Sequence, residues 1–466
     1  MLMTAEFLSR LQFAFTISFH ILFPAFSIGL ITFISIIEGI YLKTKNIRFL
    51  NMAKFWTKIL ALTFGMGIVS GIVMEFQLGT NWAGFANVVG SVLGSLFTYE
   101  VLTAFFIEAG FLGVMFFGWN KVGPKLHYTA TLLVWLGVSI SAFWILSANS
   151  WMQNPTGARL EMGRFVTDSW AEVIFNPILI PRFLHMLLAA YISTFFVVAG
   201  ISAYYLLSNR HIQFAKTCFS IAMLMLLIMV PMQWLVGDKV GLNVHEYQPL
   251  KTAAMEGVWE TQEGAPLLLF AIPVQSEAKN YYEVKIPHLA SLLNTHQWNG
   301  KLVGLKTVQP EDRPYVFIVF WSFRIMVGLG LLMGLIVLTG LWLRLTKRLH
   351  TARWFLKVCV AITPIGFISI MTGWFTAEVG RQPWIVYNLL RTADAGSPIT
   401  VWHVLASFIL LIIVYGVIFG YFYFKYLFKT IAAGPSAEDE PDPTDVAFPF
   451  MAQEDLVPDI DSSNKQ

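Results

Sequence analysis

The residues most suited to chemistry are gathered at the end of one long apolar segment, in the stretch Gly373–Trp384. Glu378 and Arg381 place an acid and a base within about one helical turn of each other where a membrane helix ends. Charged groups are costly in hydrocarbon and usually mark function there. Trp374 and Glu378 are four apart and share a helix face, while Gly380 is typical of a helix end. Such a carboxylate could cap a structural network, carry protons, or bind a metal or haem iron.

The composition decides what kind of protein positions these groups. Hydrophobic residues make up 56% of the chain, charged residues only 13%, and the mean hydropathy is +0.64. These values predict an all-α polytopic membrane protein, because a water-soluble domain cannot bury that much apolar surface. We expect about nine transmembrane helices. The predicted spans are 12–41, 52–78, 92–118, 127–150, 183–207, 214–237, 314–343, 352–376 and 399–428.

Basic residues predict how these helices are oriented. They crowd the first, third, fifth and seventh connections, whereas the second connection, 79–91, has none. The positive-inside rule therefore puts the N-terminus outside and the C-terminus in the cytoplasm. The net charge of +3 is explained by this bias, and no basic face typical of nucleic-acid binding is present. The first segment lacks a small-residue cleavage site, so we expect it to be a retained helix.

Four regions follow from this topology. Helices 1–6 occupy 1–237, an outer connection occupies 238–313, helices 7–9 occupy 314–429, and a tail occupies 430–466. The tail is acidic and contains proline, so we expect it to be disordered and cytoplasmic. The helices show no internal repeat of the kind found in many transporters. Neither cysteine belongs to a Cys-x-x-Cys pair, and we assign them no role.

Five residues from different helices fall in the predicted outer half of the membrane. They are His20, Glu100, His185, Met326 and Glu378. Pro24 is expected to kink the first helix beside His20. Each residue also has an ordinary interpretation, because an intramembrane His is often a packing residue and a Met in an apolar helix is usually core. Their common depth favours a joint function, because scattered structural residues would not sort to one level.

Haem binding would account for this combination. His with Met makes a six-coordinate electron-transfer haem, whereas His or Glu alone leaves an iron with an open position for a gas. Arg182, Arg324 and Arg381 are candidate partners for haem propionates, because guanidinium pairs with carboxylates. Gly330-x-x-x-Gly334 could be a close helix crossing or clearance for a flat macrocycle.

Two further carboxylates stand in the third helix. Glu100 and Glu108 are eight apart and hence within about 80° of one another around an α-helix. Glu108 lies deeper toward the cytoplasm in the predicted topology and could relay protons. A buried structural carboxylate is the alternative interpretation of Glu108.

Several motifs together resemble subunit I of the cytochrome bd quinol oxidases. The resemblance extends over nearly the whole membrane portion. The motifs are Gly373–Trp384, Trp321–Met326, Met74–Trp82 and the helix from Glu100 to Trp119. It implies a nine-helix subunit that carries two haems b, one low-spin and one high-spin, and one haem d. It also implies reduction of O2 to water with electrons from quinol and protons from the cytoplasm, generating a proton-motive force without a pump.

The resemblance also implies roles for single residues. His185 and Met326 would bind the low-spin haem b iron, and His20 and Glu378 would be axial ligands of the two high-spin haems. Which of these two residues binds which high-spin haem stays open. Trp374 would lie between haems, Arg324 and Arg381 would bind cofactor, and Glu100 and Glu108 would serve the oxygen site and the proton path.

The outer connection resembles the quinol-oxidising loop of the same family. In the stretch 248–257, Lys251 and Glu256 match the positions that recognise quinol and take its protons, although spacing alone would indicate a solvated charge pair. The short loop resembles the subgroup that includes cyanide-insensitive oxidases. The implied partners are subunit II, membrane quinol and O2, and in some assemblies a small single-helix subunit. The implied location is the bacterial cytoplasmic (inner) membrane.

Three other classes of protein were weighed against the oxidase. A haem-free transporter or channel would also bury carboxylates, but it needs no outer set of His and Met and commonly has broken, repeated helices. A copper-containing haem oxidase needs more intramembrane histidines than His20, His185 and His403. A b-type electron carrier would need paired His ligands, which this chain does not supply.

Overall fold

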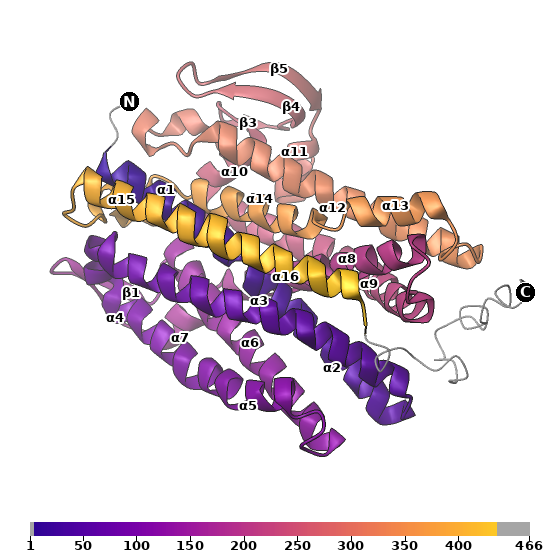
Figure 1. The fold of residues 1–466 in the computed structure, drawn as a ribbon. Helices are drawn as coiled ribbons and strands as arrows, with labels where there is room; N and C mark the ends of the chain where they lie inside the picture. The colour runs from indigo at the N-terminus through magenta and orange to yellow at the C-terminus, as the bar shows by residue number, and fades with distance from the viewer. Residues whose placement is uncertain (1–3, 436–466) are drawn as a thin grey trace, which may run out of the picture.

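The computed structural model describes residues 4–435. Across those residues, nine helical segments are long and apolar enough to cross a membrane, as the sequence predicts. Figure 1 shows most of them running side by side in one bundle. The predicted acidic tail lies almost entirely outside the described residues. The spans are Ala5–Thr44, Ile47–Thr80, Ala83–Phe117, Pro124–Gln153, Trp170–Leu207, Ile212–Tyr247, Pro310–Leu345, Arg353–Val379 and Val401–Ala433.

Several spans are assembled from more than one helical element. The helices are α1 (Ala5–His20), α2 (Leu22–Thr44), α3 (Ile47–Thr80), α4 (Ala83–Glu100), α5 (Phe106–Phe117), α6 (Pro124–Gln153), α7 (Trp170–Ile174), α8 (Leu179–Leu207), α9 (Ile212–Tyr247), α12 (Val316–Leu345), α13 (Arg353–Ala361), α14 (Ile365–Val379), α15 (Val401–Leu411) and α16 (Gly420–Ala433). Two π-helical segments, Val101–Phe105 and Ile412–Phe419, join α4 to α5 and α15 to α16. Several span ends differ from the predicted ones. The first span begins at Ala5 and the third at Ala83, α9 continues ten residues past 237, and α16 continues past 429.

The first span is interrupted beside His20, as Pro24 predicts. The element α1 ends at His20 and α2 begins at Leu22. Proline has no backbone N–H and its ring clashes with the carbonyl four residues earlier, which here belongs to His20. His20 is therefore the last residue of α1, directly before the interruption.

The connection between α9 and α12 folds outside the bundle (Figure 1). Its helix α10 (Pro249–Glu256) begins with a proline and ends at Gly257, which has a φ of +68° that glycine adopts without strain. An antiparallel hairpin follows, with Leu267 opposite Ile286 and Val274 opposite Lys279. The remaining elements are β3 (Gln262–Glu263), β4 (Leu267–Val274), β5 (Lys279–Ile286), α11 (Leu289–Thr295) and β6 (Lys301–Leu302).

Short strands also close two other connections. They are β1 (Ala158–Glu161) with β2 (Arg164–Thr167), and β7 (Trp384–Val386) with β8 (Leu390–Arg391). Both pairs are antiparallel hairpins that follow a spanning helix, α6 and α14 respectively. The chain after α14 thus turns back within a few residues of Glu378.

Hydrogen bonds show which helix ends lie together. Gln248 after α9 donates to the Gln153 carbonyl at the end of α6, 2.5 Å away, and Asn81 after α3 donates to Gln12 near the start of α1. We call this side, which carries α10 and the β4–β5 hairpin, the loop end. The opposite side carries the lysine- and arginine-rich connections, and we call it the basic end.

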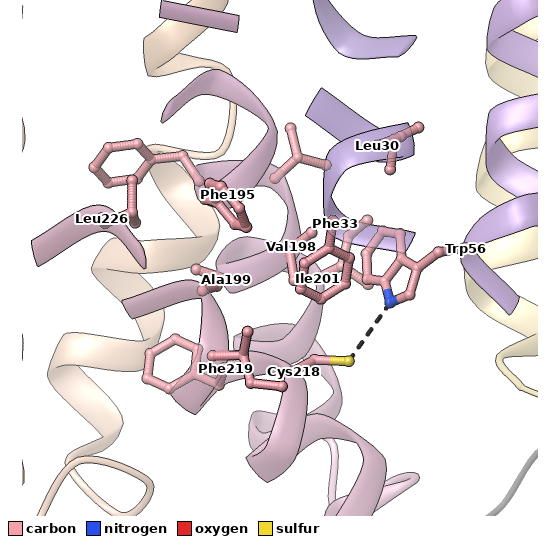
Figure 2. Packing of buried hydrophobic residues seen from close by; sticks show 14 of the residues in the cluster. Leu30, Phe33, Trp56, Phe195, Val198, Ala199, Ile201, Cys218, Phe219 and Leu226 are labelled. Atoms are coloured by element: carbon pink, nitrogen blue, oxygen red, sulfur yellow. Dashed lines mark hydrogen bonds between the residues drawn. The ribbon is translucent and has the colours of Figure 1, made fainter. Parts of the chain in front are cut away.

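The largest apolar cluster of the interior is formed mainly by α2, α3, α8 and α9. Figure 2 shows Phe33 between Phe195 and Trp56, with the Trp56 indole donating to the Cys218 sulfur. The rings of Phe33 and Trp56 meet edge to face. Many large apolar side chains elsewhere remain exposed on the spanning helices, as expected for surfaces that face lipid or another subunit. This cluster packs α8, which carries Arg182 and His185, against α2 and α9.

Candidate functional site

The carboxylate of Glu378 lies at the centre of a hydrogen-bonded cluster at the loop end. The helix α14 ends at Val379, one residue later, with Gly380 as its C-cap, as predicted. One carboxylate oxygen of Glu378 accepts from Asn149 Nδ2 and Gln153 Nε2, each at 3.0 Å. The other accepts from Arg381 at 2.5 Å. The acid and base that the sequence puts one turn apart therefore form a partly buried ion pair.

Two more cations join this cluster from other elements. Arg182 of α8 donates to the side chains of Asn149 and Ser150, and Lys251 of α10 donates to Gln153 Oε1 at 2.6 Å. Lys251 is only 4% exposed. Burial holds the pKa of Lys251 well below its usual value; the Glu378 charge opposes this shift, while the neighbouring arginines add to it.

The cluster thus gathers three basic side chains around one carboxylate. Within the described chain, the Arg381 Nε atom is buried and has no hydrogen-bond partner. Buried polar atoms normally have a partner, so a further acceptor belongs beside it. The cluster is suited to hold additional anionic groups.

The amides that hold Glu378 were missed from the sequence. Asn149 and Gln153 are four apart in the last turn of α6 and so present both amides on one face. Two amides at this spacing where an apolar span ends are a signal that could have been used. Gln153 links Lys251 of the loop to Glu378, because its carbonyl oxygen accepts from one and its amide donates to the other.

The three other predicted iron ligands each face a glycine on a neighbouring helix. A Cβ at Gly71 would lie 3.2 Å from His20 Cε1, one at Gly237 would lie 3.4 Å from His185 Nε2, and one at Gly373 would lie 2.8 Å from Met326 Sδ. His20 Nδ1 also lies 3.0 Å from Ser70 Oγ. Hydrogen bonding at one ring nitrogen orients a histidine and leaves the other for a ligand.

The glycines of the Gly330-x-x-x-Gly334 pattern accommodate a tryptophan. Trp234 of α9 donates to the Gly330 carbonyl, and a Cβ at Gly334 would overlap its indole ring. The pattern therefore serves the contact between α9 and α12. Trp374 is partly buried on α14 beside Phe375, with the ring centroids 6.0 Å apart.

Glu100 and Glu108 both face α6. Glu100 accepts from Ser141 at 2.7 Å, and the Glu108 side chain packs where Gly137 has no Cβ. The π-helical segment Val101–Phe105 lies between the two glutamates. Its wide turn takes up one extra residue, which reduces their separation around the axis from about 80° to about 20°.

Glu75 of α3 is a third carboxylate in this neighbourhood that the sequence analysis left without a role. It interacts electrostatically with Glu100 and lines a cavity with Leu78, Phe97 and Val101. Its position inside the Met74–Trp82 motif was the available signal. Glu75 is exposed five residues before the end of its spanning helix, where a carboxylate facing lipid is costly, so this face is expected to be covered in the membrane.

Glu256 and Lys251 both belong to α10, but their side chains have different surroundings. Glu256 is 1% exposed and accepts from Arg324 at 2.6 Å and from Asn294 at 3.1 Å. It also lines a cavity of about 340 Å³ beneath the β4–β5 hairpin, together with Trp259. Lys251 points instead into the Glu378 cluster, so its predicted contact with quinol stays a prediction.

The comparisons with known proteins bear on this arrangement. A family model described as cytochrome bd terminal oxidase subunit I matches residues 8–435. This chain belongs to the cytochrome bd terminal oxidase subunit I family. The resemblance read from the sequence motifs is thereby confirmed.

Individual members of the family match over almost their full length. The chain is 37% identical to the cytochrome bd ubiquinol oxidase subunit 1 of Bacillus subtilis (strain 168), covering 96% of this chain and 97% of the relative. It is 33% identical to the cytochrome bd-II ubiquinol oxidase subunit 1 of Escherichia coli (strain K12), covering 94% and 98%. The solved bd oxidase of Geobacillus thermodenitrificans matches with a TM-score of 0.86 at 29% identity, covering 93% of this chain and 99% of that one. The family and the nine apolar spans together describe a multi-pass bacterial membrane protein.

The residues of this chain fit the haem groups that the family implies. His20, His185, Met326 and Glu378 are the types of side chain that bind haem iron or can do so, and glycines leave room beside three of them. Haem propionates are carboxylates, and the cluster at the loop end has surplus cations and an unpaired Arg381 Nε. Glu378 Oε2 accepts only from Arg381 among the described residues, which leaves it acceptor capacity.

Proposed function

We propose that this chain is the haem-carrying subunit of a terminal quinol:O2 oxidoreductase in the bacterial cytoplasmic membrane. The observation that carries the proposal is the buried cluster at the loop end, where Arg182, Arg381 and Lys251 surround Glu378. A haem-free structural network would not need two cations beyond its one carboxylate. Anionic cofactors beside the cluster supply the missing charge.

The proposed cofactors are two haems b and one haem d. His185 of α8 and Met326 of α12 would hold the low-spin haem b iron, and His20 and Glu378 would hold the irons of the two high-spin haems. Arg381 and Arg182 would bind propionates. The haems supply electron transfer and O2 reduction when bound. Trp374, which shares α14 with Glu378, would lie between haems.

Quinol oxidation is assigned to the cavity that Glu256 lines. A carboxylate within reach of a quinol hydroxyl accepts its proton, and Arg324 fixes the carboxylate in place. Arg324 would therefore act on the quinol side as well as near Met326, two residues later. Lys251, whose contact with quinol is predicted from the resemblance, lies one turn before Glu256 on α10 and donates to Gln153.

Protons for water formation are proposed to come from the basic end through Glu108 and Glu100. Their alignment on one face toward α6 supports this route. With the basic end in the cytoplasm, as the positive-inside rule indicates, the oxidase would build a membrane potential without a separate pump. Subunit II, together with a small single-helix subunit in some assemblies, would cover the face that exposes Glu75.

An absorption spectrum of the purified oxidase, recorded with oxygen consumption on quinol addition, tests this function. We expect haem b bands, a red-shifted chlorin band and quinol-dependent oxygen uptake. Haem b bands without oxygen uptake would indicate an electron carrier. A preparation of folded protein without haem would contradict the proposal and favour a transporter or channel.

A further inference from the structure

A buried acid–imidazole pair at the basic end has no role in the function described so far. Glu38 of α2 and His127 of α6 meet with Oε1 and Nδ1 2.6 Å apart, and each residue is 2% exposed. Thr131 donates to the second carboxylate oxygen at 2.8 Å. Ionisable groups this deeply buried are expensive, and a pair of apolar residues would often be as stable.

The contacts of His127 determine where a proton is held. Its Nε2 lies 3.2 Å from the Met115 carbonyl of α5, so Nε2 carries a hydrogen and donates. Nδ1 and the Glu38 oxygen would then be two acceptors facing each other at 2.6 Å unless a proton lies between them. The pair therefore holds one proton that neither partner needs for its other hydrogen bonds.

The groups around the pair leave this proton exchangeable. The Trp119 indole packs on the imidazole with ring centroids 3.8 Å apart. The Thr131 hydroxyl bonds Glu38, and the Met115 carbonyl bonds His127. None of these neighbours is charged, and the contacts of the pair among the described residues include no third ion. Transfer of the shared proton to another group would change the net charge of the pair by one unit.

Polar groups continue from the pair toward the loop end between α2 and α6. One turn along α2, the Ser35 hydroxyl is buried and has no partner among the described residues, which marks a place for an internal water. The next turn carries Thr32, whose hydroxyl accepts from Trp135 of α6 at 3.1 Å. Tyr191 of α8 hydrogen-bonds in the same group.

This series reaches the level of Glu108. Thr32 lies six residues from Glu38, about 9 Å along the helix, and Trp135 is only two residues from Gly137, against which Glu108 packs. On α5, Met115 is seven residues from Glu108, about 10 Å, on nearly the same face. Water molecules beside the unpartnered Ser35 hydroxyl, and between it and Glu108, can bridge a distance of this size.

We propose that the Glu38–His127 pair is the proton-loading site from which Glu108 is supplied, an inference that rests on the proposed oxidase function. One proton leaves the pair for the Glu108 carboxylate, leaving ionised Glu38 and neutral His127. A proton from the basic side then refills the pair, so protons balance and no electron moves. The site would set how fast protons reach the oxygen chemistry without touching haem or quinol.

Glu38→Gln and His127→Gln in the purified oxidase test the proposal, with haem content as the measure of intact folding. Both variants should keep wild-type haem bands, lose at least about tenfold in oxygen consumption, and show a larger solvent deuterium isotope effect. Glu38→Asp, which keeps an ionisable group, should recover part of the rate. His350→Gln is the matched control, because His350 also bonds a hydroxyl, that of Ser220, at the basic end.

Each other outcome is decisive. Wild-type oxygen consumption and isotope effect in both glutamine variants would overturn the loading site. Loss of haem from both variants would show that the pair is structural and would overturn it as well. Absence of haem from the wild-type protein would instead contradict the oxidase function itself.

Discussion

At the scale of single residues, the surroundings of Glu378 explain how a carboxylate persists at a membrane depth where charge is costly. Two amides and a guanidinium donate to its oxygens, and Arg182 and Lys251 donate in turn to those two amide side chains. Removing one partner of such a network leaves buried charge without compensation, at a cost of about 3–5 kcal/mol. Glu378 is thus held in one orientation, which a metal ligand requires.

Gly373 limits the space beside Met326. In Gly373→Ala, the new Cβ would lie 2.8 Å from Sδ, so the thioether must move or the helices must separate. Overpacking of this kind costs about 1–3 kcal/mol. We expect the low-spin haem signature to weaken or shift in the absorption spectrum. Gly328→Ala, where a Cβ meets open space, is the control, and equal spectra for both variants would remove Met326 from the low-spin site.

Glu256 offers a second test at this scale. Glu256→Gln keeps the shape and an acceptor for Arg324 but removes the base, so quinol oxidation should fall by about 10²–10⁴ while all haem bands remain. Steady-state oxygen consumption with quinol measures the fall. Glu283→Gln changes another carboxylate lining the same cavity and should be near normal. Undiminished activity in Glu256→Gln would assign proton acceptance to another group.

At the scale of elements, the sequence predicts the helices well and their irregularities poorly. Nine apolar runs and Pro24 suffice for the spans and for the break at His20. The π-helical segment Val101–Phe105 has no comparable signal, because its residues are ordinary helix and strand formers and only packing against α6 selects the wide turn. Glu100 and Glu108 therefore lie within the predicted limit of about 80°, and the sequence does not show that the π-helical segment narrows their separation to about 20°.

The candidate site shows the same division. Glu378, Arg381 and the predicted iron ligands stand out because charged, His or Met side chains are conspicuous in apolar helices. Gln153, Asn149 and the Glu38–His127 pair do not, since their partners are distant in sequence and become visible only when helices meet. Lys251 points into the Glu378 cluster because α10 packs on α9 and α12. The spacing of Lys251 and Glu256 in the sequence does not show this packing.

The contact between α5 and α6 gives a prediction at this scale. In Gly137→Ala, the added Cβ would lie 2.7 Å from Glu108 Cγ and would push the carboxylate away from α6. Oxygen consumption should fall severalfold with haem content unchanged, because the displaced Glu108 is proposed to relay protons and not to bind iron. Gly113→Ala on α5, where space is open, is the matched control. Full activity in Gly137→Ala would mean that Glu108 needs no fixed position.

At the scale of the whole molecule, function is divided between the two ends of the bundle. The Glu378 cluster, the Glu256 cavity and the chain connections that hold them lie at the loop end. In the proposed function, electrons passing from quinol to haems at the loop end would travel mostly parallel to the membrane. Protons drawn from the basic end would instead cross much of the bundle, so proton movement would carry the charge that builds a potential.

In the proposed function, this vectorial movement depends on Glu108. Each proton that rises from the basic end stores about 2.3 kcal/mol per 100 mV, and water formation takes about one proton per electron. In vesicles containing Glu108→Gln, we expect oxygen consumption and the potential formed after quinol addition to fall together, with haem bands retained. The membrane potential is read with a voltage-sensitive dye, and Glu161→Gln, an exposed carboxylate at the loop end, serves as the control. Normal oxygen uptake with a normal potential would show that protons reach the oxygen site by a route that avoids α5, because a neutral amide cannot relay them.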